Sequence, residues 1–370
     1  MKAEDNYYKI GHLLNPLNIE IGDVAPIGKR CNIKVPARVD TFLCHHDYFV
    51  NPPRPQVYPV NSINFSVNKF TEADVSIRND GKIVIDASDK HQAIIEHAIK
   101  IMQKTLRIKT GFNVRAKNMH DISHGGLGSS AAIMAAVAQA VNILMGNVLS
   151  IENMTKLLAQ NYGEETIKKG FLSTMASLGG ATATALSGKS LIVVGGEADI
   201  WCLDQIPKGY CAMLLYPKNV ESISGITDMN LYEKGFTLFE NIGGEWGNIK
   251  ENILKTKIIP AINKNDYSIL FRSINMYTVG AYGDIPQYFK SRWESHHMYF
   301  DSFIYSIFSR LFRSLKIDEN CFFVSSGGPL IVIITKHYNE SLHLLGDLKK
   351  CFFIEKVPLC RRASYFHLIK

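Results

Sequence analysis

The sequence predicts an α+β protein with two domains. Its 370 residues are more than a single ordinary hydrophobic core accommodates. The composition, 46% apolar and 20% charged, is typical of a folded globular enzyme rather than a disordered chain. Segments with strand and helix periodicity alternate in both halves of the chain. The turn residues Ile206-Pro207-Lys208-Gly209 separate two expected strands, so we place the domains at residues 1–205 and 206–370.

Several segments of the first half have the pattern of strands or helices. Alternating apolar and polar residues predict strands over 33–39, 61–67 and 73–77, the last two as antiparallel strands. Asn79-Asp80-Gly81-Lys82 predicts a hairpin turn into a strand over 83–85. Helical periodicity predicts helices over 89–104 and 150–161. Further strands are expected over 110–116 and 191–194.

Residues 131–145 are nearly all apolar. Gln139 and Asn142 interrupt this segment, and it is shorter than a bilayer span. It therefore predicts a buried helix rather than a membrane helix. In the second half we expect helices over 253–262, 267–277 and 300–315, and strands over 210–216, 322–324 and 330–335.

The net charge and the cysteines indicate which partners and which cellular location to expect. The net charge of +7 fits an anionic ligand, and the basic residues are spread along the chain, which favours a phosphate pocket over a nucleic-acid surface. Seven scattered cysteines without a C-x-x-C pair, and a polar first segment, predict reduced thiols in a cytoplasmic protein. We expect small-molecule substrates, no nucleic-acid or membrane partner, and leave a homodimer open.

The clearest chemical signal is a glycine-rich loop ahead of the apolar helix. Gly125, Gly126 and Gly128 permit positive φ angles and a close approach of backbone N–H groups to an anion. The first N–H groups of a helix have no internal acceptor, and the helix dipole favours negative charge there. Ser129 and Ser130 add hydroxyl donors. The loop predicts phosphate binding; the structural alternative is a tight turn alone.

Four segments resemble parts of the GHMP superfamily, which includes galactose, homoserine and mevalonate kinases, and three of them match its ordered motifs. Gly126-Leu127-Gly128-Ser129-Ser130-Ala131-Ala132 resembles its phosphate loop, and Val35-Pro36-Ala37-Arg38-Val39-Asp40 resembles its first motif. His45-His46-Asp47-Tyr48 resembles the sugar-contacting stretch of galactose kinases, and Ser325-Ser326-Gly327-Gly328-Pro329 resembles the third motif. The resemblance implies a ribosomal-protein-like N-terminal domain, a ferredoxin-like C-terminal α/β sandwich, and a nucleotide or diphosphate held between them.

The kinase pattern is incomplete. Family kinases commonly carry an aspartate in a stretch after the second motif, and no acid occurs in the corresponding residues 170–177. Glu164 and Glu165 precede that stretch and are expected to be solvated charges at a helix end. Cys44 occupies the position of the usual glutamate of the first motif.

The segments 177–196 and 206–225 and the Ser-Ser-x-Gly-Pro form of the last motif resemble β-ribofuranosylaminobenzene 5′-phosphate synthase. That resemblance implies a transferase that joins phosphoribosyl pyrophosphate to an aromatic or heteroaromatic acid, with loss of pyrophosphate and carbon dioxide. We take this as the main expectation. The alternatives are an ATP-dependent small-molecule kinase with an acid recruited from elsewhere, such as Asp47, and a non-catalytic protein of the same fold.

The candidate site residues follow from these motifs. Arg38 is expected to bind a phosphate or carboxylate, the alternative being a salt bridge at a strand edge. His45 and Asp47 are candidates for proton transfer, the alternative being a surface loop. Mg²⁺ is expected to bridge oxygens of the cosubstrate, phosphoribosyl pyrophosphate or ATP, and to contact Ser129 or Ser130. The other expected ligand-binding residues are Gly125, Gly126, Leu127, Gly128, Ser325, Ser326, Gly327 and Gly328.

Overall fold

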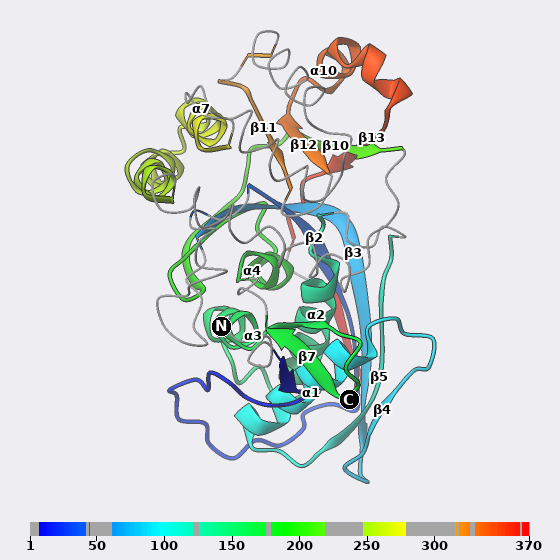
Figure 1. Cartoon of the computed structure of the whole chain (residues 1–370). Coiled ribbons are helices and arrows are strands. Elements are labelled where there is room, and N and C mark those ends of the chain that lie inside the picture. Colours follow the sequence, from blue (N-terminus) through cyan, green and yellow to red (C-terminus); the bar gives the residue numbers. More distant parts are fainter. Residues whose placement is uncertain are drawn as a thin grey trace.

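Three β-sheets and the helices packed on them make up the described part of this computed structural model. The structure describes residues 7–41, 44, 61–120, 126–174, 179–218, 247–278, 315–316, 318–325, 330–362 and 365–369. Figure 1 shows the large sheet and its helices in the lower part of the view and a four-stranded sheet above them. The expected α+β class with two layered units is confirmed.

The large sheet contains seven strands, with the order β14-β2-β3-β5-β4 and β8 and β9 attached beside β3. The long strand β3 pairs with β2 on one side and with β8 and then β5 on the other. The strands are β2 (Arg30–Asp40), β3 (Ser62–Arg78), β4 (Ile83–Ile85), β5 (Gly111–Asn118), β8 (Leu191–Gly195), β9 (Asp199–Asp204) and β14 (Tyr365–Ile369).

Two expectations for this sheet were wrong. The segments 61–67 and 73–77 belong to one strand, because residues 70–72 continue the pairing with β2. Asn68 and Lys69 form a bulge in β3 opposite Pro36 and Ala37. The turn at 79–82 does not form a hairpin between β3 and β4. Instead β4 pairs parallel with β5, which lies between it and β3 and buries Phe112 and Val114.

Helices α1 (Gln92–Leu106), α2 (Ser129–Leu144), α3 (Ile151–Gln160) and α4 (Gly179–Ser187) form the helical layer inside the curved large sheet (Figure 1). The predicted buried helix is confirmed as α2, in which every residue except Gln139 is buried. Asn142 is tolerated there because its amide donates to Leu149 O and accepts from Leu149 N–H, at 2.9 and 3.0 Å. Among the described residues, no helix combines the length and apolarity needed to cross a bilayer.

A small sheet beside these helices has the order β1-β7-β6. Its strands are β1 (Tyr7–Lys9), β6 (Gly163–Glu165) and β7 (Phe171–Thr174), all antiparallel to their neighbours. Ser150 caps α3 by accepting a hydrogen bond from Asn153 N–H at 3.2 Å. Along the chain, β6 and β7 lie between α3 and α4.

The four-stranded antiparallel sheet has the order β11-β12-β10-β13. With α7 after β10 and α10 before β13, it has the β-α-β-β-α-β arrangement expected for a ferredoxin-like unit. The elements are β10 (Cys211–Pro217), α7 (Tyr267–Thr278), β11 (Asn320–Val324), β12 (Ile331–Thr335), α10 (Tyr338–Leu344), the 3₁₀ turn η4 (Gly346–Lys350) and β13 (Phe352–Pro358).

The helix expected over 253–262 is divided into a π-helical turn, η3 (Leu254–Ile258), and α6 (Ile259–Asn263). Pro260 lies in the first turn of α6 and has no N–H to donate back into the preceding turn, which accounts for the change in helix type. Most of the helix expected over 300–315 lies outside the described residues.

One hydrophobic cluster joins the two larger sheets. It combines Ala37 and Phe65 of the large sheet with Ala212 and Phe323 of the four-stranded sheet. The rings of Phe65 and Phe323 stack with centroids 5.6 Å apart. The domain boundary near 206–209 remains a prediction: β9 and β10 belong to different sheets, yet β14 returns to pair with β2.

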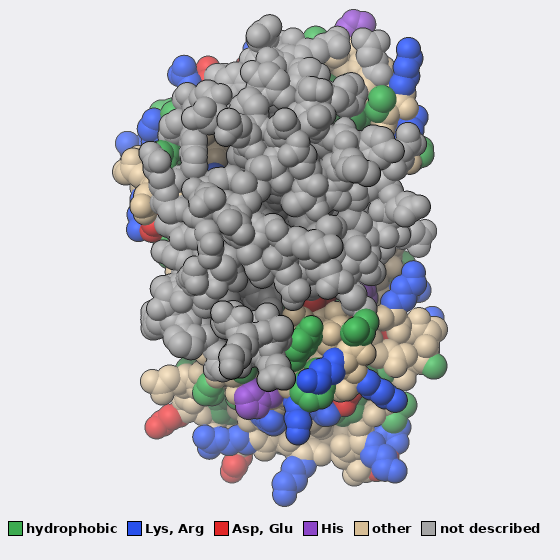
Figure 2. Space-filling view, viewed as in Figure 1, with side chains coloured by type: hydrophobic (Ala, Val, Ile, Leu, Met, Phe, Trp, Pro, Cys, Tyr) green, Lys and Arg blue, Asp and Glu red, His purple; other side chains and the backbone are tan. Residues whose placement is uncertain are grey.

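The surface carries charges of both signs. On the face seen in Figure 2, the described Lys and Arg side chains are interspersed with acidic and neutral ones.

Candidate phosphate-binding site

The described part of the glycine loop has the backbone conformation that its glycines permit. Gly126 and Gly128 have φ angles of 85° and 65°, in the left-handed region that favours glycine. Gly128 is the N-cap of α2, and the first helical hydrogen bond runs from Ala132 N–H to Gly128 O at 2.9 Å. The N–H groups of Ser129 and Ser130 therefore precede the hydrogen-bonded part of the helix, where an anion is favoured.

Arg38 lies between the N-terminal ends of two helices. A Cβ atom at Gly128 would lie 3.0 Å from Arg38 Cγ and Nε and 3.2 Å from the Cβ of Ala181, the third residue of α4. The backbone N–H of Arg38 donates to Leu127 O at 3.3 Å. A guanidinium thus adjoins the starts of both α2 and α4, which is an arrangement suited to negative charge.

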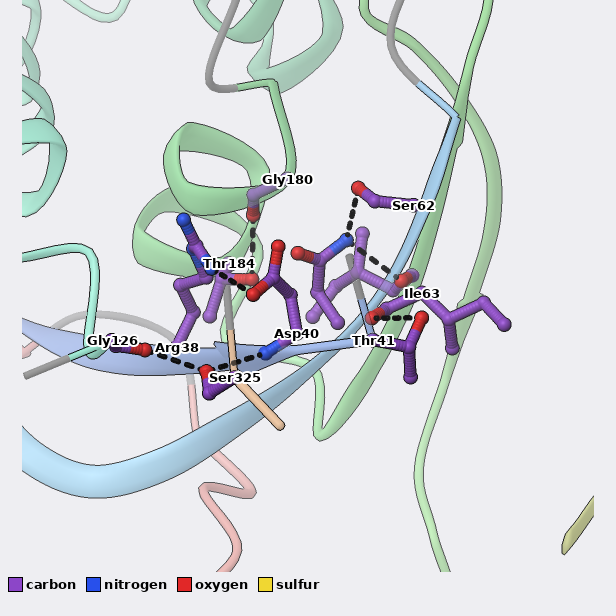
Figure 3. A network of polar contacts seen from close by, with 11 residues as sticks. Arg38, Asp40, Thr41, Ser62, Ile63, Gly126, Gly180, Thr184 and Ser325 are labelled. Carbon is purple, nitrogen blue, oxygen red and sulfur yellow. Dashed lines mark hydrogen bonds and ion pairs between the residues drawn. The ribbon is translucent and has the colours of Figure 1, made fainter. Parts of the chain in front are cut away.

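Arg38 also forms an ion pair with Asp40 (Figure 3). Both side chains are almost entirely buried, at 5% and 6% exposure. The salt bridge considered as the structural alternative for Arg38 is therefore present, but it lies in the interior beside the glycine loop. Ion pairs are costly to bury, since both charges lose their hydration.

Ser325 connects the third motif to the first two. Its hydroxyl donates to Gly126 O at 2.6 Å and accepts from Asp40 N–H at 3.1 Å (Figure 3). Ser325 is fully buried, and a Cβ at Gly126 would lie only 2.6 Å from Ser325 O. This close approach requires a glycine at position 126. Three segments far apart in the sequence meet at this one side chain.

A buried asparagine stands beside Asp40. Asn64 of β3 is the cross-strand partner of Asp40, and its amide Nδ2 donates to Ser62 Oγ at 3.0 Å. Its Oδ1 is buried and has no hydrogen-bond partner among the described residues. A Cβ at Gly180 would lie 2.2 Å from that Oδ1, so the start of α4 rests directly against Asn64.

Glu164 and Glu165 lie in strand β6, and the expectation that they are solvated helix-end charges was wrong. The Tyr162 hydroxyl donates to Glu164 Oε1 and also hydrogen-bonds the hydroxyl of Ser130. Burial raises the pKa of Glu164 above its ordinary value. A carboxyl group is therefore connected to the loop serine through Tyr162.

The other predicted site residues divide into two groups. Leu127 directs its side chain into the cluster that joins the two sheets, so only its backbone is available to a ligand. Ser129 is buried at the start of α2. Positions outside the described residues are Gly125, His45, Asp47, Ser326, Gly327 and Gly328.

Sequence reasoning missed Asp40 and Asn64 as site residues and misinterpreted Glu164. A signal for the first two was present. Side chains two residues apart in a strand lie on the same face, so Arg38 and Asp40 share one face of β2. Ser62, Asn64 and Ser66 also alternate, and all three are buried, which is unusual for a strand that packs on a core.

Comparisons with known proteins show similarity in sequence and in fold. Residues 93–180 match the model of the GHMP kinases N terminal domain. The 4-diphosphocytidyl-2-C-methyl-D-erythritol kinase of Histophilus somni is 25% identical over 135 residues, which are 35% of this chain and 41% of that protein. The chain thus matches about two fifths of the length of this curated relative.

Solved structures share the fold along nearly the whole chain. Homoserine kinase from Cytophaga hutchinsonii has a TM-score of 0.56 at 15% identity, covering 95% of this chain and 100% of that one. Mevalonate diphosphate decarboxylase from Staphylococcus aureus has a TM-score of 0.59 at 12% identity, covering 92% and 98%. These likenesses show that the chain has the GHMP-kinase fold. The matched domain covers part of the first half of the chain, and the shared fold extends over most of the chain.

Proposed function

We propose that this chain is a kinase that transfers a phosphoryl group from ATP to a small molecule. The observation that carries the proposal is the position of Arg38 between the N-terminal ends of α2 and α4. Enzymatic phosphoryl transfer depends mainly on positioning the reactants and neutralising charge on the phosphates. Backbone N–H groups, two serine hydroxyls and a guanidinium supply both at this place.

Each part of the site has a task under this proposal. The amides and hydroxyls of Ser129 and Ser130 would bind phosphate oxygens at the start of α2. Arg38 would balance their charge, and Ser325 would hold the glycine loop at a fixed distance from β2 through its two hydrogen bonds. Such prepositioned donors lower the barrier most where charge develops in the reaction.

Mg²⁺ is expected with ATP, and the residues present fit it. Mg²⁺ prefers oxygen ligands and is commonly held by one or two carboxylates together with substrate phosphates. The Ser130 hydroxyl and the Glu164 carboxyl, connected through Tyr162, would hold it, and a cation would offset the burial that disfavours the ionised Glu164. When bound, the ion would neutralise charge on the phosphates.

This proposal replaces the ribosyltransferase as the preferred function. The absence of an acid in residues 170–177 was one reason for expecting phosphoribosyl pyrophosphate, together with the resemblance of segments 177–196 and 206–225 and of the last motif. A buried carboxylate, Asp40, adjoins the loop from β2, which weakens that reason. Two of the three related proteins reported above are kinases, and the third is a decarboxylase.

Thermal unfolding of the full chain with Mg²⁺ and either ATP or phosphoribosyl pyrophosphate tests the donor. A ligand that binds only the folded chain raises the melting temperature by mass action. We expect a rise with ATP, followed by acceptor-dependent ADP in a screen that includes homoserine, mevalonate and 4-diphosphocytidyl-2-C-methyl-D-erythritol.

Two other results would each favour a different function. Stabilisation by phosphoribosyl pyrophosphate alone, with acceptor-dependent pyrophosphate from aromatic acids, would restore the ribosyltransferase. ATP binding without ADP formation from any acceptor would favour a non-catalytic member of the fold.

A further inference from the structure

We infer that Asp40, on strand β2, is the carboxylate that receives the proton of the substrate hydroxyl. The inference rests on the proposed kinase activity. Residues 170–177, which precede α4, contain no acid that could accept this proton, whereas β2 supplies Asp40.

Asp40 lies at the point where all three motifs meet. Its backbone N–H donates to Ser325 Oγ, and the same hydroxyl donates to the glycine loop at Gly126 O. Its carboxylate pairs with Arg38, and a Cβ at Gly128 would lie 3.0 Å from that arginine and 3.2 Å from the Cβ of Ala181. A phosphate bound at the start of α2 and a hydroxyl directed at it would therefore have this carboxylate beside them (Figure 3).

The ion pair fixes the carboxylate for such a role. Arg38 and Asp40 are two residues apart on one strand, so their side chains leave the same face of β2. Asn64 flanks Asp40 from β3, and its buried Oδ1 has no partner among the residues that the structure describes. A buried amide oxygen without a donor is costly to maintain, and a hydroxyl entering between Asn64 and Asp40 would satisfy it.

The start of α4 cannot supply the acid itself. Gly179 and Gly180 carry no side chains, and a Cβ at Gly180 would lie 2.2 Å from Asn64 Oδ1. Any side chain at position 180 would therefore have to displace Asn64. The space that a side chain at position 180 would need is already filled by Asn64, which lies beside Asp40.

The neighbouring described carboxyl groups are engaged elsewhere. Glu164 accepts from the Tyr162 hydroxyl, which also contacts Ser130, and it is the carboxyl proposed to hold Mg²⁺. Glu165 accepts from Ala93 N–H at 3.3 Å and pairs with His91. Asp40 is the described carboxylate that contacts the arginine of the site.

The step balances as an ordinary phosphoryl transfer. The oxygen of the substrate hydroxyl uses an electron pair to form a bond to the γ-phosphorus of ATP. The bond from that phosphorus to the bridging oxygen breaks, and its electron pair leaves with ADP. The hydroxyl proton moves to the Asp40 carboxylate, as the catalytic aspartate of protein kinases accepts a substrate proton.

The test compares Asp40→Asn with the matched control Asp74→Asn. Asp74 also pairs with an arginine of β2, Arg30, but at the exposed end of the sheet. We expect Asp40→Asn to lower kcat for acceptor-dependent ADP formation by about 100-fold or more, since positioned proton transfer contributes that much. The rise in melting temperature with Mg-ATP should persist, and Asp74→Asn should match the unaltered chain in both measurements.

Retention of kcat within about threefold in Asp40→Asn would overturn the inference. If Asp40→Asn no longer responds to Mg-ATP, Asp40→Ala with added formate decides the matter. Restored turnover with formate supports proton transfer to a carboxylate here, and no restoration overturns it. Failure of the unaltered chain to form ADP would overturn the proposed function and this inference together, before any variant is compared.

Discussion

The two ends of strand β2 carry the same kind of residue pair in opposite surroundings. At one end Arg30 pairs with Asp74, with side-chain exposures of 55% and 23%. At the other end Arg38 pairs with Asp40, at 5% and 6%. A solvated pair forms readily and contributes little, whereas a buried pair must offset the lost hydration of both charges. The buried pair is therefore the one that needs a functional explanation, and it lies beside the glycine loop.

The largest expected effect concerns the stability of the buried pair. Arg38→Ala would leave the Asp40 carboxylate buried without its guanidinium, and breaking a buried pair in this way costs about 4 kcal/mol. Urea unfolding followed by circular dichroism measures the change. The double variant Arg38→Leu/Asp40→Leu should be less destabilised than Arg38→Ala, because no charge remains in the interior. A double variant that is less stable than the single one would contradict this account.

A smaller effect extends the comparison to a buried histidine. His97 in α1 is fully buried; its Nδ1 accepts from Gly11 N–H at 2.9 Å and its Nε2 donates to Asn161 O at 2.7 Å. Burial lowers the pKa of His97 from 6.5 to about 4. Below pH 6.5 His97 is protonated in the unfolded chain but stays neutral in the folded chain. The free energy of unfolding is therefore highest above pH 6.5 and falls as the pH is lowered towards 4.

The size of this loss follows from the shift of the pKa, and it approaches about 3 kcal/mol at pH 4. Urea unfolding at a series of pH values measures it. In His97→Gln this part of the acid dependence should disappear, while the exposed control His367→Gln should keep it. An unchanged slope in His97→Gln would show that other groups cause the acid dependence.

The next effect is on ligand binding and compares the two ends of α2. Gly128 precedes the helix and Gly146 follows it, and both have positive φ angles, 65° and 91°. Substitution by alanine strains the backbone at each, by about 1–2 kcal/mol. Only a Cβ at position 128 would press on Arg38, at 3.0 Å. We expect the affinity of Gly128→Ala for Mg-ATP to be lower than that of Gly146→Ala by about 10-fold or more. Titration calorimetry measures both affinities. Equal affinities of the two variants would show that the glycine loop does not bind the nucleotide.

The smallest effect is expected at the exposed end of β2. Arg30→Ala should leave the urea midpoint and the rate of ADP formation unchanged, because Arg30 and Asp74 are solvated and far from the glycine loop along the strand. A marked loss of stability or of activity would show that the exposed Arg30–Asp74 pair matters as much as the buried Arg38–Asp40 pair.

Local patterns predicted the helices and most strands because their signals are local. The apolar run that became α2, the serine cap of α3 and the glycine loop depend on residues close in sequence. The pairing of β4 with β5 could not be predicted in this way, since register and neighbours depend on segments far apart in the chain. The continuity of β3 across 68–72 depends on a bulge at Asn68 and Lys69, which the alternating pattern does not indicate.

The site was predictable in part for the same reason. Motif spacing indicated Arg38, the loop and Ser325, which the fold brings together. Glu164 was misinterpreted because its burial depends on the small sheet formed with β1 and β7, which the sequence pattern does not reveal. Asp40 was overlooked because its importance lies in its neighbours Asn64 and Gly180, and neither is close to it in sequence.

The pairing of β14 with β2 has a consequence for the chain as it is synthesised. β14 begins 325 residues after the end of β2, so at 5–20 residues per second β2 would wait roughly 16 to 65 s on the ribosome for this neighbour. An unpaired strand edge is a template for association with other chains. During this interval the nascent large sheet exposes an edge that the finished protein covers, and chaperone binding to the growing chain would be most needed then.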